Sequence, residues 1–584
     1  MKKRITAFLT GLLSLTAAYG QYPVESYQEI PNPTPTDRSL WQSLSDPVIG
    51  WGSIDIRYPK ERPAEGLTAG ELQLRGWRGE RVYAQAVVSS SSPLTALTYE
   101  ISDLRSNDGA LIPSPQGKSG TGFVRYVLTD ELNKDGLGGC GERPDHSLFD
   151  STLVADGIDH LARSLDLTPC TTRPIWFSID IPRDARAGSY RATVTVRNGD
   201  RTLATLPLSV VVDERALPEK SDFFLDLWQN PYAIARYYGV TPWSEEHFSI
   251  MRPYMEMYRD AGGKAITASI IYKPWNGQTH DPFDSMIDWK LGRDGKWHFD
   301  YTHFDEWVSF MMDLGIDKAI TCFSMVPWEL SFRYLDEASG EYRFLKAEPG
   351  SEPYTELWSA MLRSFAQHLR AKGWIDRTYI AMDERSPEVM EECFRLIKEA
   401  DPELKVHMAG ALHEELSDHL DYYCVGLAAK YSEELKAKRR SEGKITTFYT
   451  CCAEPRPNTF TFSAAADGEW YGWYAAREGL DGYLRWAYNS WVEQPLLDSR
   501  YSNWAAGDTY LVYPGVRSSI RFERLRRGIQ AFDKIKALRS QYAGDRQALA
   551  KIDEALSLFD EGKLSPSYTS DRIINEAREI IETL

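Results

Sequence analysis

The chain has 584 residues, with 67 Lys and Arg against 84 Asp and Glu, which gives a formal net charge of −17. This charge argues against a protein that binds nucleic acid through a basic surface, because such binding depends on cations that displace counterions from phosphates. The composition, with 42% hydrophobic, 12% aromatic and 26% charged residues, excludes a disordered or collagen-like chain. The length indicates two or three domains.

The first twenty residues have the pattern of a secretory signal peptide. Basic residues at 2–4 precede an apolar stretch at 5–15, and small residues follow up to Gly20. The apolar stretch is too short to cross a membrane as a helix. The first cysteine, Cys140, lies far from the cleavage point, which disfavours a lipid anchor. We therefore expect residues 1–20 to be removed and the mature protein to be periplasmic or secreted, with no membrane span.

The region from residue 22 to 213 has the pattern of a β-sandwich domain. Short runs of alternating apolar and polar residues, such as 82–88, 122–127 and 190–196, are separated by clusters of Gly, Pro, Ser and Asp. A period of two is typical of antiparallel sheets that have one solvated face. Such runs at this spacing predict a β-sandwich. The segment 213–219, which contains Pro218, is predicted to be a linker.

Seven cysteines are an odd number for an oxidising compartment. Cys140 and Cys170 flank one segment and are candidates for a disulfide. The other five lie in or beside apolar runs and are expected to be buried thiols: Cys322, Cys393, Cys424, Cys451 and Cys452. The chain lacks Cys-x-x-Cys and paired His spacings, so we predict neither a metal site nor another cofactor.

From residue 220 to 515 the pattern alternates between strands and helices. Eight apolar, β-rich runs occur at 223–228, 265–272, 316–325, 378–382, 405–411, 421–425, 445–451 and 482–491. Helical patterns at 245–261, 304–314, 354–372 and 387–400 lie between them, while the fifth to seventh units are short of helix. Strands buried on both faces read as continuous apolar runs, so this region predicts a (β/α)8 TIM-like barrel. The last segment, 516–584, predicts helices packed against the barrel, and the fold class is multidomain, β plus α/β.

Two consecutive carboxylates follow the fourth predicted strand. The run 379–382 leads directly into Asp383 and Glu384. Barrel enzymes carry their active sites at the carboxyl ends of the strands, and buried charges are costly unless they open into a cleft or are paired. These residues are therefore candidate catalytic groups. The alternative is that Asp383 caps the next helix and Glu384 pairs with a base such as Arg385.

Aromatic and amide side chains follow several of the other strands. Apolar rings can stack on sugar faces while amides and carboxylates bind hydroxyl groups, and pockets that combine them suit carbohydrate. Trp228 and Trp328 follow the first and third strands. Our candidates for substrate binding follow the second, seventh and eighth strands: Trp275, Tyr449, Trp486, Asn489 and Trp491.

Two carboxylates without a nucleotide-binding, thiol or metal motif point to glycoside hydrolysis. Successive side chains of a strand point to opposite faces, so in a conventional mechanism the nucleophile would come from elsewhere, for instance Glu329 or Asp481. Alternatively, the substrate can supply the nucleophile. A sugar with a 2-acetamido group can attack its own anomeric carbon through the amide oxygen and form an oxazoline, and the enzyme then needs only the adjacent pair.

The sequence resembles glycoside hydrolase family 123, the β-N-acetylgalactosaminidases that have an N-terminal β-sandwich and a catalytic barrel. The resemblance extends over most of the chain from about 220 to 540, while the sandwich is similar only in architecture. The motifs that carry it are residues 379–384 and, more extensively, 472–528, with Gly472-Trp473, residues 479–486, Asn489-Ser490-Trp491, Tyr513-Pro514-Gly515 and residues 519–528. It implies that Asp383 stabilises the oxazolinium and that Glu384 is the general acid and base. It also supports the placement of Asn489 and Trp491 at the sugar.

The expected function is thus an exo-acting hydrolase that removes terminal β-linked N-acetylgalactosamine with retention, through substrate-assisted catalysis. The expected partner is a glycan that contains an N-acetylhexosamine, and the oligomeric state is open. Two alternatives are left open. One is a conventional retaining glycosidase of other specificity, and the other is a non-catalytic glycan-binding protein.

Overall fold

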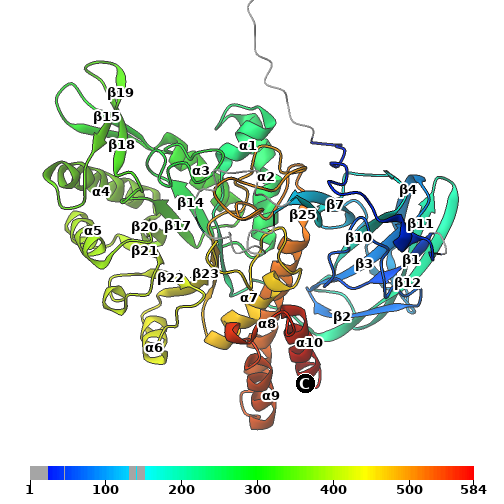
Figure 1. The fold of residues 1–584 in the computed structure, drawn as a ribbon. Helices are drawn as coiled ribbons and strands as arrows, with labels where there is room; N and C mark the ends of the chain where they lie inside the picture. Colours follow the sequence, from blue (N-terminus) through cyan, green and yellow to red (C-terminus); the bar gives the residue numbers. More distant parts are fainter. Residues whose placement is uncertain (1–23, 45–46, 131–139, 141–150) are drawn as a thin grey trace, which may run out of the picture.

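The computed structural model describes residues 24–44, 47–130, 140 and 151–584, which form a β-rich N-terminal domain and an α/β barrel (Figure 1). The expected signal peptide at residues 1–20 lies outside the described residues. None of the helices in the described ranges combines the length and the apolar character that a membrane crossing requires.

The N-terminal domain contains two sheets. The first has the strand order β1 (Val48–Gly52), β3 (Arg81–Ser90), β10 (Thr171–Asp180), β7 (Gly122–Thr129), β8 (Thr152–Asp159) and β25 (Ser518–Ser519). The second has the order β2 (Leu72–Arg78), β12 (Arg201–Ala216), β11 (Gly188–Asn198), β4 (Leu94–Ile101) and β9 (Leu165–Leu167), and β5 (Leu104–Ser106) and β6 (Leu111–Ile112) extend from β11.

The two sheets enclose one apolar core. Alternate residues of β3, such as Ala84 and Ala86, share a buried cluster with alternate residues of β11, such as Val194 and Val196. The period of two in the sequence thus reflects inward-facing positions on both sheets.

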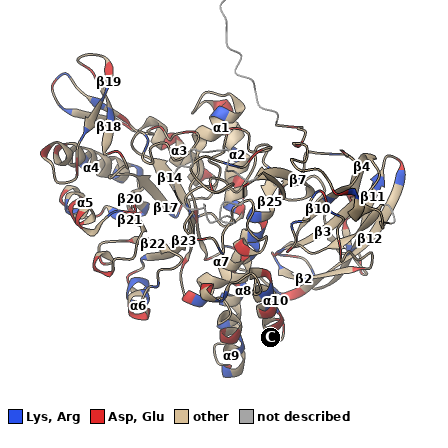
Figure 2. Cartoon of the chain, in the orientation of Figure 1, with Lys and Arg blue, Asp and Glu red and all other residues tan. Residues whose placement is uncertain are grey.

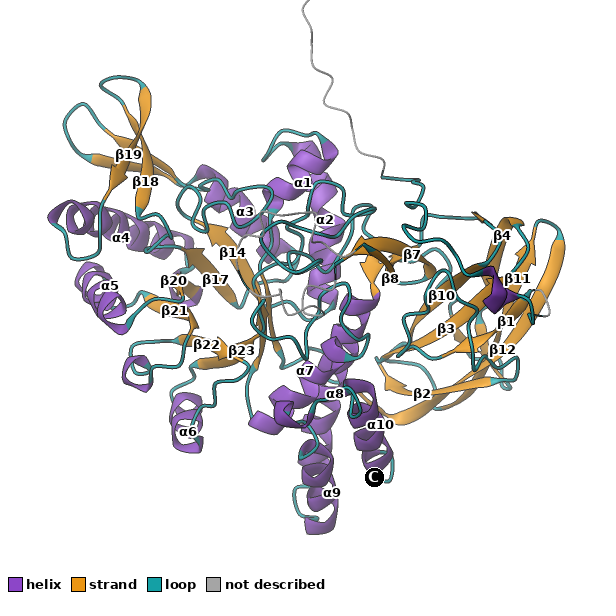
Figure 3. Cartoon of the chain, viewed as in Figure 1, coloured by secondary structure: helices purple, strands orange, loops and turns teal. Residues whose placement is uncertain are grey.

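The second region is a nearly closed barrel of parallel strands (Figure 3). Its eight strands are β13 (Phe224–Leu227), β24 (Gly482–Arg485), β23 (Ile445–Tyr449), β22 (Tyr422–Gly426), β21 (Lys405–Gly410), β20 (Thr378–Asp383), β17 (Ala319–Phe323) and β14 (Ala265–Ser269), in spatial order. The Lys264 amide donates to the Leu225 carbonyl at 2.9 Å, which links the two ends of the sheet. All eight strands coincide with the runs that the sequence predicts.

Helices surround the barrel and follow the predicted pattern. They are α1 (Pro231–Tyr238), α2 (Glu245–Asp260), α3 (Thr302–Asp313), α4 (Glu352–Lys372), α5 (Pro387–Ala400), α6 (Glu433–Ser441), α7 (Asp467–Glu478) and α8 (Ile520–Gln541). Between β21 and β22 the described chain forms only a short 3-10 helix, η4 (Glu414–Leu416). This confirms that the fifth unit is short of helix, but the sixth and seventh units contain α6 and α7, so the same prediction is wrong for them. The chain ends with α9 (Arg546–Leu556) and α10 (Ser570–Ile581).

A four-stranded sheet that we did not predict stands on the barrel. It consists of β16 (Trp297–Asp300), β15 (Asp288–Leu291), β18 (Ser331–Asp336) and β19 (Glu341–Lys346), in spatial order. The pair β15 and β16 belongs to the segment after β14, and the pair β18 and β19 belongs to the segment after β17. Both segments begin at carboxyl ends of barrel strands, so this sheet extends from that rim, as the upper left of Figure 1 shows.

Helix α8 lies between the barrel and the N-terminal domain and carries charged residues along its length (Figure 2). Arg521 contacts Asp156 of β8 at 2.9 Å, and Arg524 contacts Asp55 at 2.5 Å and Glu469 of α7 at 2.7 Å. All of these groups except Asp55 are almost completely buried. The C-terminal helices therefore pack on both domains and not only on the barrel.

The approach of α7 to α8 requires glycine. A Cβ atom at Gly472 would lie 1.8 Å from the carbonyl oxygen of Gly528, and one at Gly528 would lie 2.5 Å from the carbonyl oxygen of Glu469. This close helix contact explains why the 472–528 pattern has Gly at both of its ends, Gly472 and Gly528.

Two cysteine predictions are wrong, namely the disulfide partner of Cys140 and the expectation that Cys452 is a buried thiol. Cys140 forms a disulfide with Cys452, not with Cys170, and the bonded residues are 312 positions apart in the sequence. Cys170 is free and partly exposed, while Cys322, Cys393 and Cys424 are buried thiols as expected. Cys451 is free but only half-buried. Proximity along the chain is a poor guide here because the disulfide joins the N-terminal part of the chain to the barrel.

Candidate active site

A pocket of 310 Å3 opens at the carboxyl ends of the barrel strands. It is lined by Cys140, Trp228, Trp275, Gln278, Trp328, Asp383, Glu384, Ala409, Tyr449, Cys451, Cys452, Leu484, Trp486 and Trp504. Five of our seven candidate site residues are therefore brought together: Trp275, Asp383, Glu384, Tyr449 and Trp486.

Asp383 points into the mouth of the barrel because of the pleat of β20. Tyr379 and Ala381 belong to the apolar cluster inside the barrel, whereas Ile380 and Met382 belong to the cluster between strands and helices. Asp383 has the same parity as Tyr379 and Ala381, so it faces inward. Its exposed fraction is 8%, and its Oδ1 has no hydrogen-bond partner.

Burial raises the pKa of Asp383 to about 6. The Arg385 guanidinium, whose Nη2 lies 3.9 Å from Oδ1, opposes this increase, and the neighbouring Glu384 adds to it. Asp383 is therefore mostly ionised at neutral pH, with its charge held in a poorly solvated place.

Glu384 reaches the same pocket because the extended conformation ends at this residue. Its φ is +40°, a left-handed value that is rare for a residue with a side chain, and its amide donates to the carbonyl of Ala409 at 2.9 Å. The Tyr449 hydroxyl donates to Oε1 of Glu384 at 3.3 Å. Unlike Asp383, Glu384 is exposed. Two neighbours of one strand thus both line the pocket, which strict alternation would prevent.

The alternative interpretation of the sequence predicts an ion pair between Arg385 and the Glu384 carboxylate, but Arg385 instead donates through Nη1 to the backbone carbonyl of Glu384, at 3.2 Å. Its Nε and Nη2 donate to the carbonyl of Val326, at 3.0 and 2.7 Å, and its guanidinium lies 4.2 Å from the ring centre of Trp328. Arg385 therefore fixes the loop after β17 beside the two carboxylates.

The walls of the pocket are aromatic. Trp228 and Trp275 stack with ring centres 4.8 Å apart, and the indole N–H groups of both lack a partner. Trp486 donates to Asp508 at 3.3 Å and makes an edge contact with Trp504, at 5.7 Å between ring centres. Such walls offer flat apolar faces with a few polar groups, as sugar pockets do.

The structure places two predicted residues away from the pocket. The side chain of Asn489 is buried and bonds both the amide and the carbonyl of Asn230, which fixes the loop between β13 and α1. Trp491 is also buried, donates to the carbonyl of Val512 and packs against Tyr237 and Tyr254. Contrary to our expectation, both support the barrel from behind the pocket.

Several lining residues were not among our candidates. Trp228 and Trp328 follow the first and third strands, so the expectation that active-site residues follow barrel strands could have included them. Trp504 lies 19 positions beyond the end of β24, in a loop without periodicity. Cys140 reaches the pocket through its disulfide to Cys452, and no local pattern indicates this.

The carboxylates proposed as conventional nucleophiles do not line this pocket. Asp481 directly precedes β24 and accepts a hydrogen bond from the Thr446 amide, which places it at the amino-terminal end of the barrel. Glu329 is exposed beside Trp328 and is not a lining residue. Among the described residues, Asp383 and Glu384 are the only carboxylates that line the pocket.

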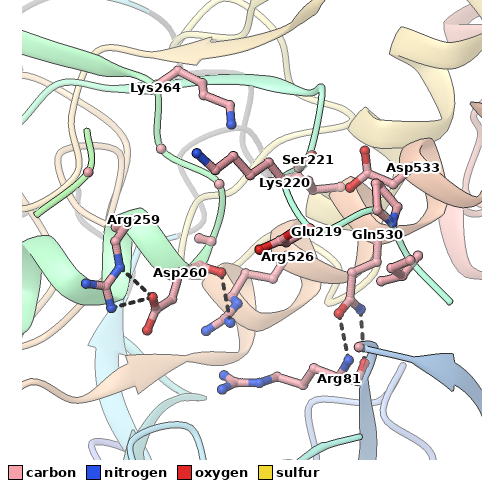
Figure 4. Close-up of a pocket in the computed structure, with 18 of the residues that line it drawn as sticks. Arg81, Glu219, Lys220, Ser221, Arg259, Asp260, Lys264, Arg526, Gln530 and Asp533 are labelled. Atoms are coloured by element: carbon pink, nitrogen blue, oxygen red, sulfur yellow. Dashed lines mark hydrogen bonds and ion pairs between the residues drawn. The ribbon is translucent and has the colours of Figure 1, made fainter. Parts of the chain in front are cut away.

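A larger hollow of 620 Å3 lies at the opposite end of the barrel (Figure 4). Lys264 and Lys318, which directly precede β14 and β17, line it together with Arg81 of the N-terminal domain and Arg526 of α8. It contains none of the candidate residues, and barrel active sites occur at the carboxyl ends of the strands. The smaller pocket is therefore the candidate active site.

Comparisons with known proteins identify the family of both domains. The model of the glycoside hydrolase 123 catalytic domain matches residues 228–538, and the model of the glycoside hydrolase 123 N-terminal domain matches residues 51–198. The comparison with curated proteins returned no match.

Among solved structures, the chain is similar to a family 123 glycoside hydrolase from Clostridium perfringens, studied for glycolipid glycan hydrolysis. The identity is 29%, the TM-score is 0.81, and the match covers 92% of this chain and 98% of the other. A family 39 glycoside hydrolase from Bacteroides cellulosilyticus matches at 12% identity and a TM-score of 0.32, over 71% of this chain and 78% of that one. We draw no argument from this second match.

The catalytic-domain match spans more than half of the chain and includes seven of the eight barrel strands, both carboxylates and every residue that lines the pocket except Cys140. We conclude that the chain belongs to glycoside hydrolase family 123.

Proposed function

We propose that this glycoside hydrolase removes terminal β-linked N-acetylgalactosamine from a glycan, with retention, and that the 2-acetamido group of the substrate acts as the nucleophile. The main support is that two adjacent carboxylates open into one aromatic pocket while no other described lining residue is a carboxylate. A conventional retaining enzyme needs a second carboxylate about 5 Å across the bond from the first.

In this proposal Asp383 acts on the acetamido group. It is ionised at neutral pH and buried, so it can accept a hydrogen bond from the amide N–H and stabilise the positive charge that develops on the oxazolinium ring. The amide oxygen attacks the anomeric carbon as the bond to the leaving oxygen breaks. A charge held in a poorly solvated site interacts more strongly than one in water.

Glu384 then transfers the protons. In its protonated form it donates to the leaving oxygen, and its carboxylate later deprotonates the water that opens the oxazoline. Its exposed position suits exchange of leaving group and water, and the hydroxyl of Tyr449 orients it at 3.3 Å. Trp228, Trp275 and Trp486 supply the faces against which the sugar ring packs.

We also propose that the protein is periplasmic or secreted. The signal-like pattern of residues 1–20 supports this, and the disulfide between Cys140 and Cys452 suits an oxidising compartment.

A direct comparison of two aryl glycosides tests the sugar specificity. We expect cleavage of aryl β-N-acetylgalactosaminide and much weaker cleavage of the corresponding N-acetylglucosaminide. Equal rates, or a preference for the gluco sugar, would contradict the galacto assignment without affecting the mechanism.

A further inference from the structure

Three large aromatic side chains among the described residues are exposed, and they belong to one segment of the chain, residues 328–344. Trp328, Tyr342 and Phe344 have exposed fractions of 43%, 62% and 55%, and the other large hydrophobic side chains with comparable exposure are aliphatic. Trp328 lines the active-site pocket, and the other two lie on β19. Exposed aromatic rings that cluster together usually mark a binding surface.

Tyr342 and Phe344 lie on the same face of the four-stranded sheet. They are two residues apart on β19, and their cross-strand partners on β18 are Leu335 and Arg333. The guanidinium of Arg333 lies 5.0 Å from the ring centre of Tyr342 and 3.8 Å from that of Tyr272. Phe344 also contacts Tyr272, at 6.2 Å between ring centres. We call Tyr272, Arg333, Tyr342 and Phe344 the rim surface.

The rim surface is continuous with the pocket along the chain in two places. Tyr272 is three residues before Trp275, which stacks on Trp228 inside the pocket. Trp328 lines the pocket three residues before β18 begins. The sheet also rises from the carboxyl-terminal rim of the barrel, where a bound glycan must leave the pocket.

The size of the pocket indicates which part of a bound glycan would contact the rim surface. At 310 Å3 it is at the small end of ligand sites, so it accommodates about one sugar residue, and the rest of a longer glycan must pass the rim. The rim surface combines flat rings with the guanidinium of Arg333, which is ion-paired with Asp284, and flat rings suit pyranose faces.

We propose that the rim surface binds the sugar residues on the leaving-group side of the scissile bond, so that the enzyme favours oligosaccharide substrates over simple glycosides. This inference rests on the proposed function. The ligand class is a neutral oligosaccharide chain attached to the cleaved terminal sugar.

Two substrates that end in the same sugar test the inference. One is an aryl β-N-acetylgalactosaminide, which fills only the pocket, and the other is a free tetrasaccharide with terminal β-N-acetylgalactosamine. For the double variant Tyr342→Ala/Phe344→Ala we expect kcat/KM on the tetrasaccharide to fall roughly 5- to 100-fold, as the loss of two ring contacts implies. Activity on the aryl glycoside should stay within about twofold, because the pocket is intact.

Leu111→Ala is the matched control. Leu111 is also an exposed large side chain, at 46%, but lies on β6 of the N-terminal domain. This variant should behave as the wild type on both substrates. Thermal unfolding of all variants shows whether they fold normally.

The possible outcomes are distinguishable. If the wild type cleaves neither substrate, the proposed function fails and the inference fails with it. If the wild type cleaves both and the double variant retains full activity on the tetrasaccharide, only the inference is overturned. Equal losses on both substrates would also overturn it.

Discussion

Asp383 and Glu384 are neighbours in the sequence but differ in their surroundings. Asp383 is buried, and its Oδ1 has no hydrogen bond and only a 3.9 Å ion pair with Arg385, whereas Glu384 is exposed and receives a hydrogen bond from Tyr449. A buried charge suits the stabilisation of a developing cation, and an exposed carboxyl suits proton transfer to and from departing and arriving groups. The structure therefore gives a physical basis for two roles in one pair.

Replacing Glu384 by Gln removes the proton donor with little change in shape. We expect the rate on a natural glycoside to fall about 10²- to 10⁴-fold, as for other general acids. The loss should be smaller on an aryl glycoside whose leaving group needs little protonation. Steady-state kinetics on both substrates measures the difference, and equal losses on both would argue against the acid role.

The pKa of Asp383 predicts the acid side of the pH profile. Its carboxyl must be ionised to stabilise the oxazolinium, and burial raises its pKa to about 6. We therefore expect kcat/KM to decline as the pH falls below about 6. A profile that stays flat down to pH 4.5 would contradict this assignment.

The same pKa affects stability. Because it is raised above the ordinary value of 3.8, the folded state binds the proton more tightly than the unfolded state, and ionisation of Asp383 opposes folding above about pH 6. Asp383→Asn should thus be inactive yet more stable at pH 7.5, by up to about 3 kcal/mol. This gain should diminish as the pH is lowered towards 4. Denaturation at both pH values measures it.

At the residue scale, the sequence identifies the carboxylate pair and three of the aromatic residues. The carboxyl ends of the barrel strands all meet at one rim, so residues that follow a strand can be predicted to line a pocket there, as Trp275, Tyr449 and Trp486 do. The positive φ of Glu384 could not, because no local residue pattern requires it. Asn489 and Trp491 follow a strand as well, but their side chains turn to internal partners that sequence alone does not reveal.

At the scale of elements, the end of β21 positions Glu384. Gly410 ends this strand, and a Cβ atom there would lie 3.0 Å from the amide nitrogen and 3.1 Å from the Cα of Glu384. Both atoms belong to the backbone, so Glu384 would have to move. Gly410 therefore holds open the space that the strained turn after β20 occupies.

Gly410→Ala should lower kcat by about 10- to 100-fold, since small displacements of a reacting group have effects of this size. Gly426→Ala is the control, because Gly426 ends the next strand and its nearest contact would be an ordinary 3.6 Å. If Gly410→Ala retains the kcat of the wild type, as the control should, Gly410 has no role in positioning Glu384. If both variants lose stability equally, the effect is general to the strand ends.

Strands buried on both faces are the elements that the sequence predicts best. Each of the eight barrel strands overlaps a predicted apolar run and extends at most one residue beyond it, because strands that are buried on both faces are rich in apolar residues. The sheet of β15, β16, β18 and β19 escapes prediction, since its strands are short, contain charged residues at many positions and, apart from three buried residues, are only partly buried or exposed. It is also the element that carries the rim surface.

At the scale of the molecule, the N-terminal domain is tied to the active site. Buried ion pairs of α8 hold it against the barrel, and the disulfide of Cys140 with Cys452 ends in the pocket wall. The long-range pairing could not be inferred from the order of cysteines along the chain. The N-terminal domain thus supports the pocket as well as the barrel.

Cys452→Ser should destabilise the protein by about 2–4 kcal/mol, the usual contribution of a disulfide, and reduce kcat/KM because the bond lies in the pocket wall. Cys170→Ser, which removes a free thiol, should leave both unchanged. Thermal unfolding with and without reductant measures the effect. If a reductant destabilises Cys452→Ser as much as the wild type, another disulfide is responsible.

The attack of the 2-acetamido group on its own sugar is the central claim, and one pair of substrates tests it most directly. An aryl β-galactoside with a 2-hydroxyl group should react at least about 10³-fold more slowly than the aryl 2-acetamido sugar, because it lacks the built-in nucleophile. Turnover of the two at comparable rates would show that the protein supplies the nucleophile and would contradict the mechanism.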